Sequence, residues 1–151
     1  MKMRRPGQTK DYILEADRES DEPTVFEFHQ LSWKEMASVN KEAALTMDQA
    51  IQVNAIYVLA KSEDRELTDD EKKRVTEIAP MGTEMIHRLN MQHSKAVKLG
   101  LEKIKNLRDE NNQPLEISIE EFEKFADRAV VRELGTAIIQ FSGFNEKNSK
   151  N

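Results

Sequence analysis

Four helix-capping boxes restrict the fold of this chain more than any other feature of its sequence. Each box pairs a serine or threonine with a Glu or Gln three residues later, at Ser32/Glu35, Thr46/Gln49, Thr68/Glu71 and Ser118/Glu121. The hydroxyl accepts the backbone N–H of the third helical residue, whose side chain accepts the N–H of the cap, so each box marks a helix start. Hydrophobic staples of Leu31 with Met36 and Ile117 with Phe122 reinforce two of these starts. The sequence therefore predicts a mainly α-helical protein.

The spacing of apolar side chains downstream of these starts predicts about five helices. They cover residues near 33–44, 47–61, 69–79, 83–106 and 119–142, with a break in the last near Asp127. The helix at 47–61 is apolar on most sides, which is typical of a helix enclosed by others, so we expect it to be the central helix. In the last helix, Phe122 and Phe125 belong to an apolar face that runs from Ile119 to Phe141.

The N-terminal part of the chain has a β pattern instead. Residues 12–14 and 25–31 are rich in β-branched and aromatic side chains, and residues 17–23 between them are polar and turn-forming. This pattern predicts a short β-hairpin within residues 11–31. Residues 115–117 are compatible with one further short strand.

The domain organisation follows from these elements. A chain of 151 residues suits one domain. We predict a flexible basic arm at residues 1–10, a single mainly helical domain with its N-terminal hairpin at residues 11–144, and a polar tail at residues 145–151.

Composition excludes several classes of function. The chain has no cysteine, which rules out disulfides, thiol catalysis and Cys-ligated zinc. Its net charge of -5 disfavours broad binding to nucleic acid or to an anionic membrane. The longest purely hydrophobic stretch, residues 55–60, is far shorter than the roughly 20 residues of a membrane-spanning helix. We expect a cytosolic protein that binds neither nucleic acid nor membrane.

The histidines and carboxylates do not form a metal-binding pattern. The three histidines are His29, His87 and His93, and the last two are separated by about 240° around a helix, so they do not share a face. Residues 109–120 approach the spacing of an EF-hand loop, but Pro114 occupies the sixth position, where calcium loops need glycine. An ordinary turn explains this segment, so we predict no metal site.

No catalytic or cofactor-binding motif is present in the sequence. It contains neither a Gly-x-Gly-x-x-Gly nor a Walker loop, and it has no Gly-x-Ser-x-Gly and no cysteine nucleophile. We therefore predict a non-enzymatic protein without a cofactor, whose function is protein–protein contact.

Two groups of apolar residues are candidates for partner binding. Met81, Met85 and Met91 either form an adaptable binding surface or fill irregular gaps in the core, and the second reading is preferred. Phe141 and Phe144 lie at the end of the last helix beside the polar tail, where an exposed apolar patch would mark an interface. Self-association of the chain or binding of a partner at Phe141, Phe144, Met81 and Met85 is the resulting prediction.

Several segments resemble small proteins of tailed-bacteriophage morphogenesis gene clusters. These segments are RPGQTKDYILEADR at 5–18, PTVFEF at 23–28 followed by Leu31, LGLEKIKNLRDEN at 99–111, and RELGTAI at 132–138 with Lys147 and Asn148. Among such proteins the chain is most similar to tail assembly chaperones. The resemblance implies a protein of the host cytoplasm that holds the aggregation-prone tape-measure protein soluble while tail-tube subunits polymerise around it. It implies no catalytic residue and no cofactor.

Alternatives from other classes remain open. The first is a structural virion component, such as a head–tail or decoration protein, which would stay in the finished particle. The less favoured ones are a small inhibitor of a host system and an enzyme, which a deep pocket with converging polar groups would support.

Overall fold

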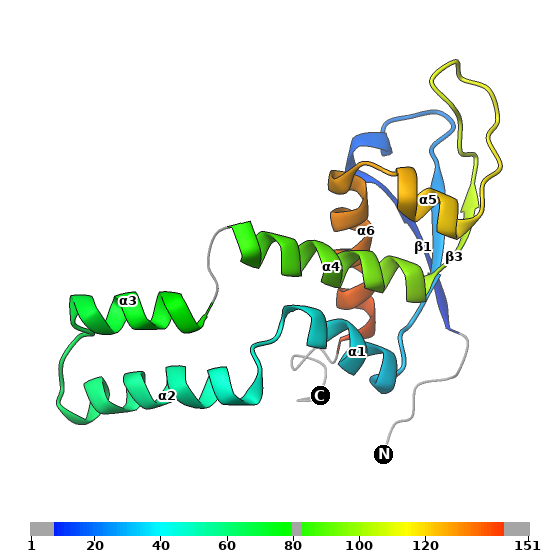
Figure 1. The fold of residues 1–151 in the computed structure, drawn as a ribbon. Helices are drawn as coiled ribbons and strands as arrows, with labels where there is room; N and C mark the ends of the chain where they lie inside the picture. The colour runs from blue at the N-terminus through cyan, green and yellow to red at the C-terminus, as the bar shows by residue number, and fades with distance from the viewer. Residues whose placement is uncertain (1–7, 80–82, 144–151) are drawn as a thin grey trace.

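The computed structural model describes residues 8–79 and 83–143, which hold six α-helices, one short 3₁₀ helix and three strands (Figure 1). Their order is β1 (Thr9–Ile13), η1 (Glu15–Asp17), β2 (Val25–His29), α1 (Trp33–Ala43), α2 (Met47–Ser62), α3 (Asp69–Ile78), α4 (Thr83–Gly100), β3 (Leu101–Lys105), α5 (Ile119–Phe125) and α6 (Arg128–Ser142). The mainly helical class is therefore confirmed. Most of the predicted basic arm and the whole polar tail lie outside the described residues. None of the described helices is both long enough and apolar enough to cross a membrane.

The predicted N-terminal hairpin is present as the antiparallel pair β1–β2, in which Thr9 pairs with His29 and Ile13 with Val25. A third strand extends it into an antiparallel sheet of order β1-β2-β3. Strand β2 therefore lies in the middle of the sheet, and its register with β3 shifts between Glu27 and Phe28.

Strand β3 corrects the prediction of one helix over 83–106. Helix α4 ends at Gly100, and the next five residues form strand β3, four of whose residues pair with β2. The physical reason is non-local. Pairing with β3 satisfies the backbone hydrogen-bonding groups on the second edge of β2, and the spacing of apolar residues along one segment does not predict its pairing with a distant strand. The strand considered at 115–117 was also wrong, since these residues belong to no strand and only an isolated bridge joins Arg108 and Pro114.

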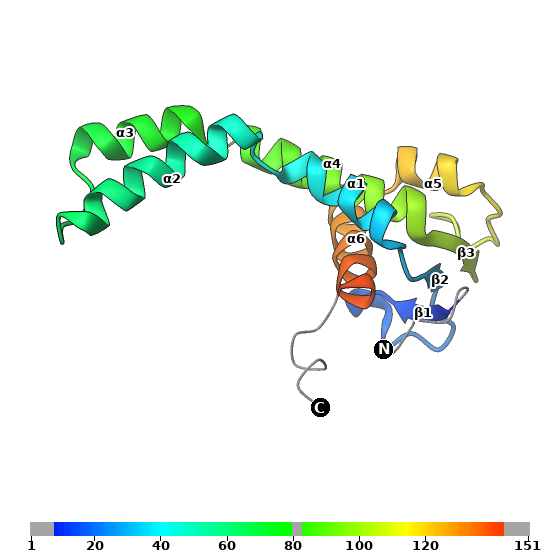
Figure 2. The ribbon, with the colours of Figure 1, turned by 90° about the horizontal axis from the view of Figure 1, so that it is seen from below.

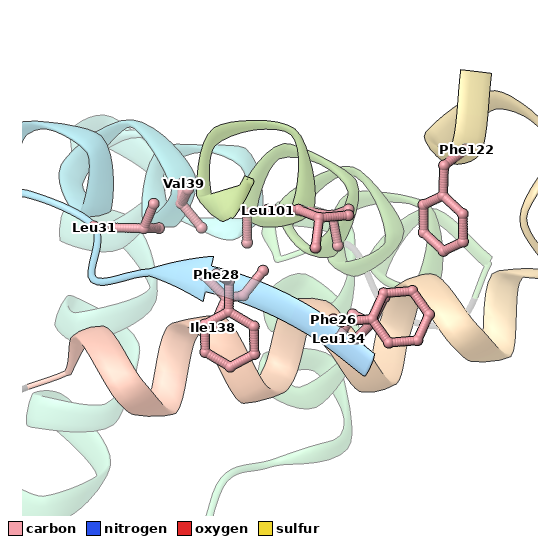
Figure 3. Close-up of a cluster of buried hydrophobic side chains, with 10 residues drawn as sticks. Phe26, Phe28, Leu31, Val39, Leu101, Phe122, Leu134 and Ile138 are labelled. Carbon is pink, nitrogen blue, oxygen red and sulfur yellow. The ribbon is translucent and has the colours of Figure 1, made fainter. Parts of the chain in front are cut away.

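The core lies between one face of the sheet and the helices α1, α4, α5 and α6. Phe26 and Phe28 alternate along β2, so both side chains point to the same face, where they are almost fully buried. They belong to one buried cluster with Val39 of α1 and with Leu134 and Ile138 of α6 (Figure 3). On the opposite face Glu27 forms an ion pair with Lys105. Helix α4 packs against both α1 and α6, and it therefore has the central place predicted for residues 47–61.

The capping boxes act as the sequence predicted. In each box the side chain of the cap residue accepts the backbone N–H three residues on, and the side chain of that third residue accepts the backbone N–H of the cap. The four caps are Ser32, Thr46, Thr68 and Ser118. The predicted break near Asp127 is also confirmed. Asp127 caps α6 by accepting the Ala129 N–H at 2.9 Å, which separates α6 from α5.

Helices α2 and α3 form a hairpin, here called the arm (residues 47–78), that projects away from the sheet and from α4 and α6 (Figures 1 and 2). The expectation that residues 47–61 form the central helix was therefore wrong. Helix α2 packs mainly against α3, and Ala60 is its one buried residue. Most sides of α2 are not covered by other described elements, although its composition is that of an enclosed helix.

An ion-pair cluster fixes the turn of the arm. Arg65 Nη2 and Nη1 donate to the two carboxylate oxygens of Glu71 at 2.8 and 3.0 Å, and Arg65 also pairs with Glu63. The hydrogen bonds from Arg65 lower the pKa of the Glu71 carboxyl. Because Glu71 also closes the capping box with Thr68, the same carboxylate joins the turn to the start of α3.

Candidate functional site

The four residues predicted to bind a partner are not brought together in the described structure. Met81 and Phe144 lie outside the described residues. Met85 is half-buried near the start of α4, and Phe141 is half-buried near the end of α6. The ring of Phe141 packs edge-on against Phe28 with a centroid distance of 5.7 Å, and its backbone oxygen accepts a hydrogen bond from Gln30. Phe141 therefore contributes to the edge of the core, and its role in partner binding stays a prediction.

A groove between α4, α5 and α6 is the more extended candidate for a binding site. It has a volume of about 460 Å³ and is named here the α4–α6 groove. Its apolar lining comes from Ile86 and Met91 of α4, from Val131 of α6, and from Ala126. The side chains of Ile86 and Met91 are exposed, so this lining is open to a partner. Phe125, at the end of α5 beside the lining residue Ala126, is 76% exposed.

The charged residues of the α4–α6 groove are mostly basic. Lys124, Arg128 and Arg132 line it, together with one carboxylate, Glu123. The Ser94 hydroxyl donates to Glu123 Oε1 at 2.5 Å, which links α4 to α5 and engages this carboxylate. A chain with a net charge of -5 therefore presents an apolar groove with a basic rim. Apolar contact with a basic rim suits an acidic amphipathic helix.

His93 lies in the lining of this groove, at the contact between α4 and α6. Its Nε2 atom is 3.4 Å from the Thr136 hydroxyl, and its Nδ1 atom is buried without a hydrogen-bond partner in the described residues. Burial lowers the pKa of His93 below its ordinary value of 6.5, and the positive charge of Arg132 lowers it further. The Ser94 hydroxyl is bonded to Glu123, so Ser94 and His93 do not form the hydroxyl–base pair that activates a nucleophile.

The depressed pKa of His93 predicts acid sensitivity at the contact of α4 with α6. Between the folded-state pKa and 6.5 the unfolded chain binds this proton more readily than the folded chain. The stabilisation of the folded state that depends on neutral His93 is therefore complete above about pH 6.5, and it is lost as the pH falls through the folded-state pKa. We expect His93→Gln to lose less melting temperature than the wild type between pH 7.5 and 5. Equal losses in both proteins would contradict this assignment.

The other polar candidates are engaged in local structure. His29 Nδ1 lies 2.9 Å from Glu102 Oε1 across the sheet. In the segment resembling an EF-hand loop, Asp109 Oδ1 accepts the backbone N–H groups of Asn111 and Gln113, which forms a turn around that carboxylate. The described residues contain no group of three or more His, Cys, Asp or Glu side chains that could hold a metal ion.

Sequence reasoning anticipated part of the α4–α6 groove and missed the rest. Met91 was among the methionines considered for an adaptable surface, whereas Ile86 was not singled out. Phe125 was expected on an apolar face of one last helix, either at an interface or in the core, and the structure places it, 76% exposed, at the end of the separate helix α5. The break at Asp127 explains the error, because α5 and α6 are separate helices and their apolar residues do not form one continuous face.

Comparisons with protein-family models, with curated proteins and with solved structures find no match for this chain.

Proposed function

We propose that this protein is a non-catalytic phage morphogenesis protein, a tail assembly chaperone that binds the tape-measure protein during tail assembly in the host cytoplasm. The sequence resemblance supplies the class of protein and its partner. The observation that carries a protein-binding function is the α4–α6 groove, whose exposed Ile86 and Met91 lie beside basic side chains.

The chemistry of the groove supports a helical client. An aggregation-prone client exposes apolar side chains, and covering them keeps the client in solution. In the groove, Met91 supplies an unbranched side chain that adapts to different apolar partners. Arg128 and Arg132 add charge complementarity to acidic residues on the polar face of such a helix. We propose that tail-tube subunits displace the chaperone as they polymerise around the client.

The test is capture of a tape-measure segment by the tagged full-length chain. We expect the double variant Ile86→Ser/Met91→Ser to weaken capture by roughly tenfold, because both side chains are exposed in the lining of the groove and exposed anchors of this size carry much of the binding energy. The matched control is Trp33→Ser/Leu115→Ser, since Trp33 and Leu115 are 74% and 38% exposed, against 59% and 47% for Ile86 and Met91, and neither of them lines the groove. This control should capture the segment as well as the wild type does.

Two results would contradict the proposal. Equal capture by both double variants would exclude the α4–α6 groove as the client site. Detection of the chain at stoichiometric levels in purified infectious particles, by mass spectrometry, would instead favour a structural virion component.

A further inference from the structure

Two histidines of the chain line the α4–α6 groove, although their positions are separated by about 240° around α4. His87 is exposed. His93 is half-buried at the contact of α4 with α6, where a Cβ atom on Gly135 would lie 2.7 Å from the His93 Cα atom. The third histidine, His29, lies beside Glu102 on the sheet and does not line the groove. Because histidine changes its charge between about pH 5 and 8, the charge of the groove depends on pH.

The permanent charges of the groove are three exposed cations and one carboxylate. No ion pair within the described residues includes Lys124, Arg128 or Arg132. The carboxylate, Glu123, accepts a hydrogen bond from the Ser94 hydroxyl. The lining therefore has a net charge of +2 when both histidines are neutral and of +4 when both are protonated. Its positive charge doubles across the pH range in which histidine titrates.

Other charged groups on and around α4 are held outside the groove. They are Arg88 with Glu84 on α4, Lys95 with Glu42 of α1, and Glu133 of α6 with Tyr12 of β1. None of them lines the groove. The charged residues of β3 follow the far end of α4. Further negative charge beside a protonated imidazole in this groove therefore has to come from a bound partner.

We propose that the α4–α6 groove binds acidic amphipathic helices in a proton-linked manner, in which His87 and His93 strengthen binding as the pH falls from about 8 to about 6. This inference rests on the proposed function, because it takes the groove as the client site. The carboxylates of the partner favour the protonated form of each imidazole, so binding takes up protons. By linkage, protonation strengthens binding to the same extent. The carboxylates themselves stay ionised in this range, because Asp and Glu titrate near pH 4.

The free protein opposes this protonation at His93. Burial and the positive charge of Arg132 both disfavour its charged form. A carboxylate of the partner placed beside Arg132 offsets the second of these effects. His93 therefore distinguishes an occupied groove from an empty one, since its affinity for a proton rises when an acidic helix binds.

The decisive experiment measures the affinity of the full-length chain for a synthetic peptide by fluorescence anisotropy at pH 8 and pH 6. The labelled peptide has about 18 residues, long enough for a helix, with leucines on one face and glutamates on the other. At about 50 mM salt, which limits screening, we expect a dissociation constant about tenfold lower at pH 6, or about threefold for each imidazole. The variant His87→Gln/His93→Gln should bind within about twofold equally at both pH values. His29→Gln, outside the groove, should keep the change seen in the wild type.

Two further measurements separate the charge of the groove from other effects of pH. His87→Lys places a permanent charge at an exposed position, and we expect it to bind the peptide about threefold more tightly than the wild type at pH 8. A peptide with glutamine in place of glutamate should bind equally at both pH values, because it has no carboxylate to favour an imidazolium. Circular dichroism at each pH verifies that every variant is folded.

Three results would overturn the inference. They are equal affinity of the glutamate peptide at both pH values, no binding of this peptide at either pH, and a wild-type pH dependence in His87→Gln/His93→Gln. The proposed function is tested separately, because capture of the tape-measure segment compares variants of Ile86 and Met91 at a single pH. Capture that depends on Ile86 and Met91 but not on pH would therefore support the client site and reject the proton linkage.

Discussion

Replacing Gly135 with alanine is expected to destabilise the protein by about 2–3 kcal/mol, although the same change in a helix ordinarily stabilises by about 1 kcal/mol. A Cβ atom at Gly135 would lie 2.7 Å from both Cα and Cβ of His93 and 2.8 Å from its backbone oxygen. The Cα and oxygen atoms belong to the backbone of α4 and the Cβ is fixed directly to it, so none of them can rotate aside as a side-chain end can. The methyl group therefore forces α4 and α6 apart and loosens the packing of the neighbouring Leu134 and Ile138. Urea unfolding of the variant measures the loss.

Gly143→Ala is the control for this prediction. The nearest atom to a Cβ at Gly143 is the Ile139 oxygen at 3.3 Å, and its φ of -64° is one that alanine adopts freely. We expect its free energy of unfolding to stay within about 0.5 kcal/mol of the wild type. A Gly135→Ala protein as stable as this control would show that α4 and α6 are not in such close contact.

The helix starts could be predicted because they depend on residues close together in the sequence. The bonds between Ser32 and Glu35, like those at the other caps, join residues three apart, so the pattern and the structure carry the same information. The break at Asp127 was predicted for the same reason, since its carboxylate caps the helix that begins at the next residue. Local patterns were reliable where the forces were local.

The errors concern residues whose structure depends on distant partners. Residues 101–105 leave the helical spacing because β2 pairs with them across more than seventy positions of the chain. Helix α2 was expected at the centre because it is apolar on most sides, as an enclosed helix is. Composition does not indicate which other element packs against such a helix. The α4–α6 groove was not predicted as a site because three helices form it, and only their packing brings Met91 near Arg132.

The core supports the second large prediction, in which Phe28→Ala is expected to cost about 3–5 kcal/mol of the free energy of unfolding. Phe28 is fully buried in the central strand, and its ring contacts Tyr12 of β1 and Phe141 of α6 with centroid distances of 6.1 and 5.7 Å. Its removal leaves a cavity where the sheet meets α6. A loss of this size is a large part of the 5–15 kcal/mol typical of a folded domain, so urea unfolding should reveal a much earlier transition.

Phe125→Ala provides the matched comparison, because the same side chain is removed from a position that is 76% exposed, and we expect a loss below about 0.5 kcal/mol.

A double-mutant cycle that combines Phe28→Ala with Phe141→Ala then decides the role of Phe141. If its ring belongs to the core, the two truncations should be coupled by about 0.5–1.5 kcal/mol, the range for edge-on aromatic pairs. Additive losses would show that Phe141 contributes little through Phe28 and would leave its ring available for a partner. A Phe28→Ala protein that unfolds at the same urea concentration as the wild type would contradict the packing of the sheet on α6.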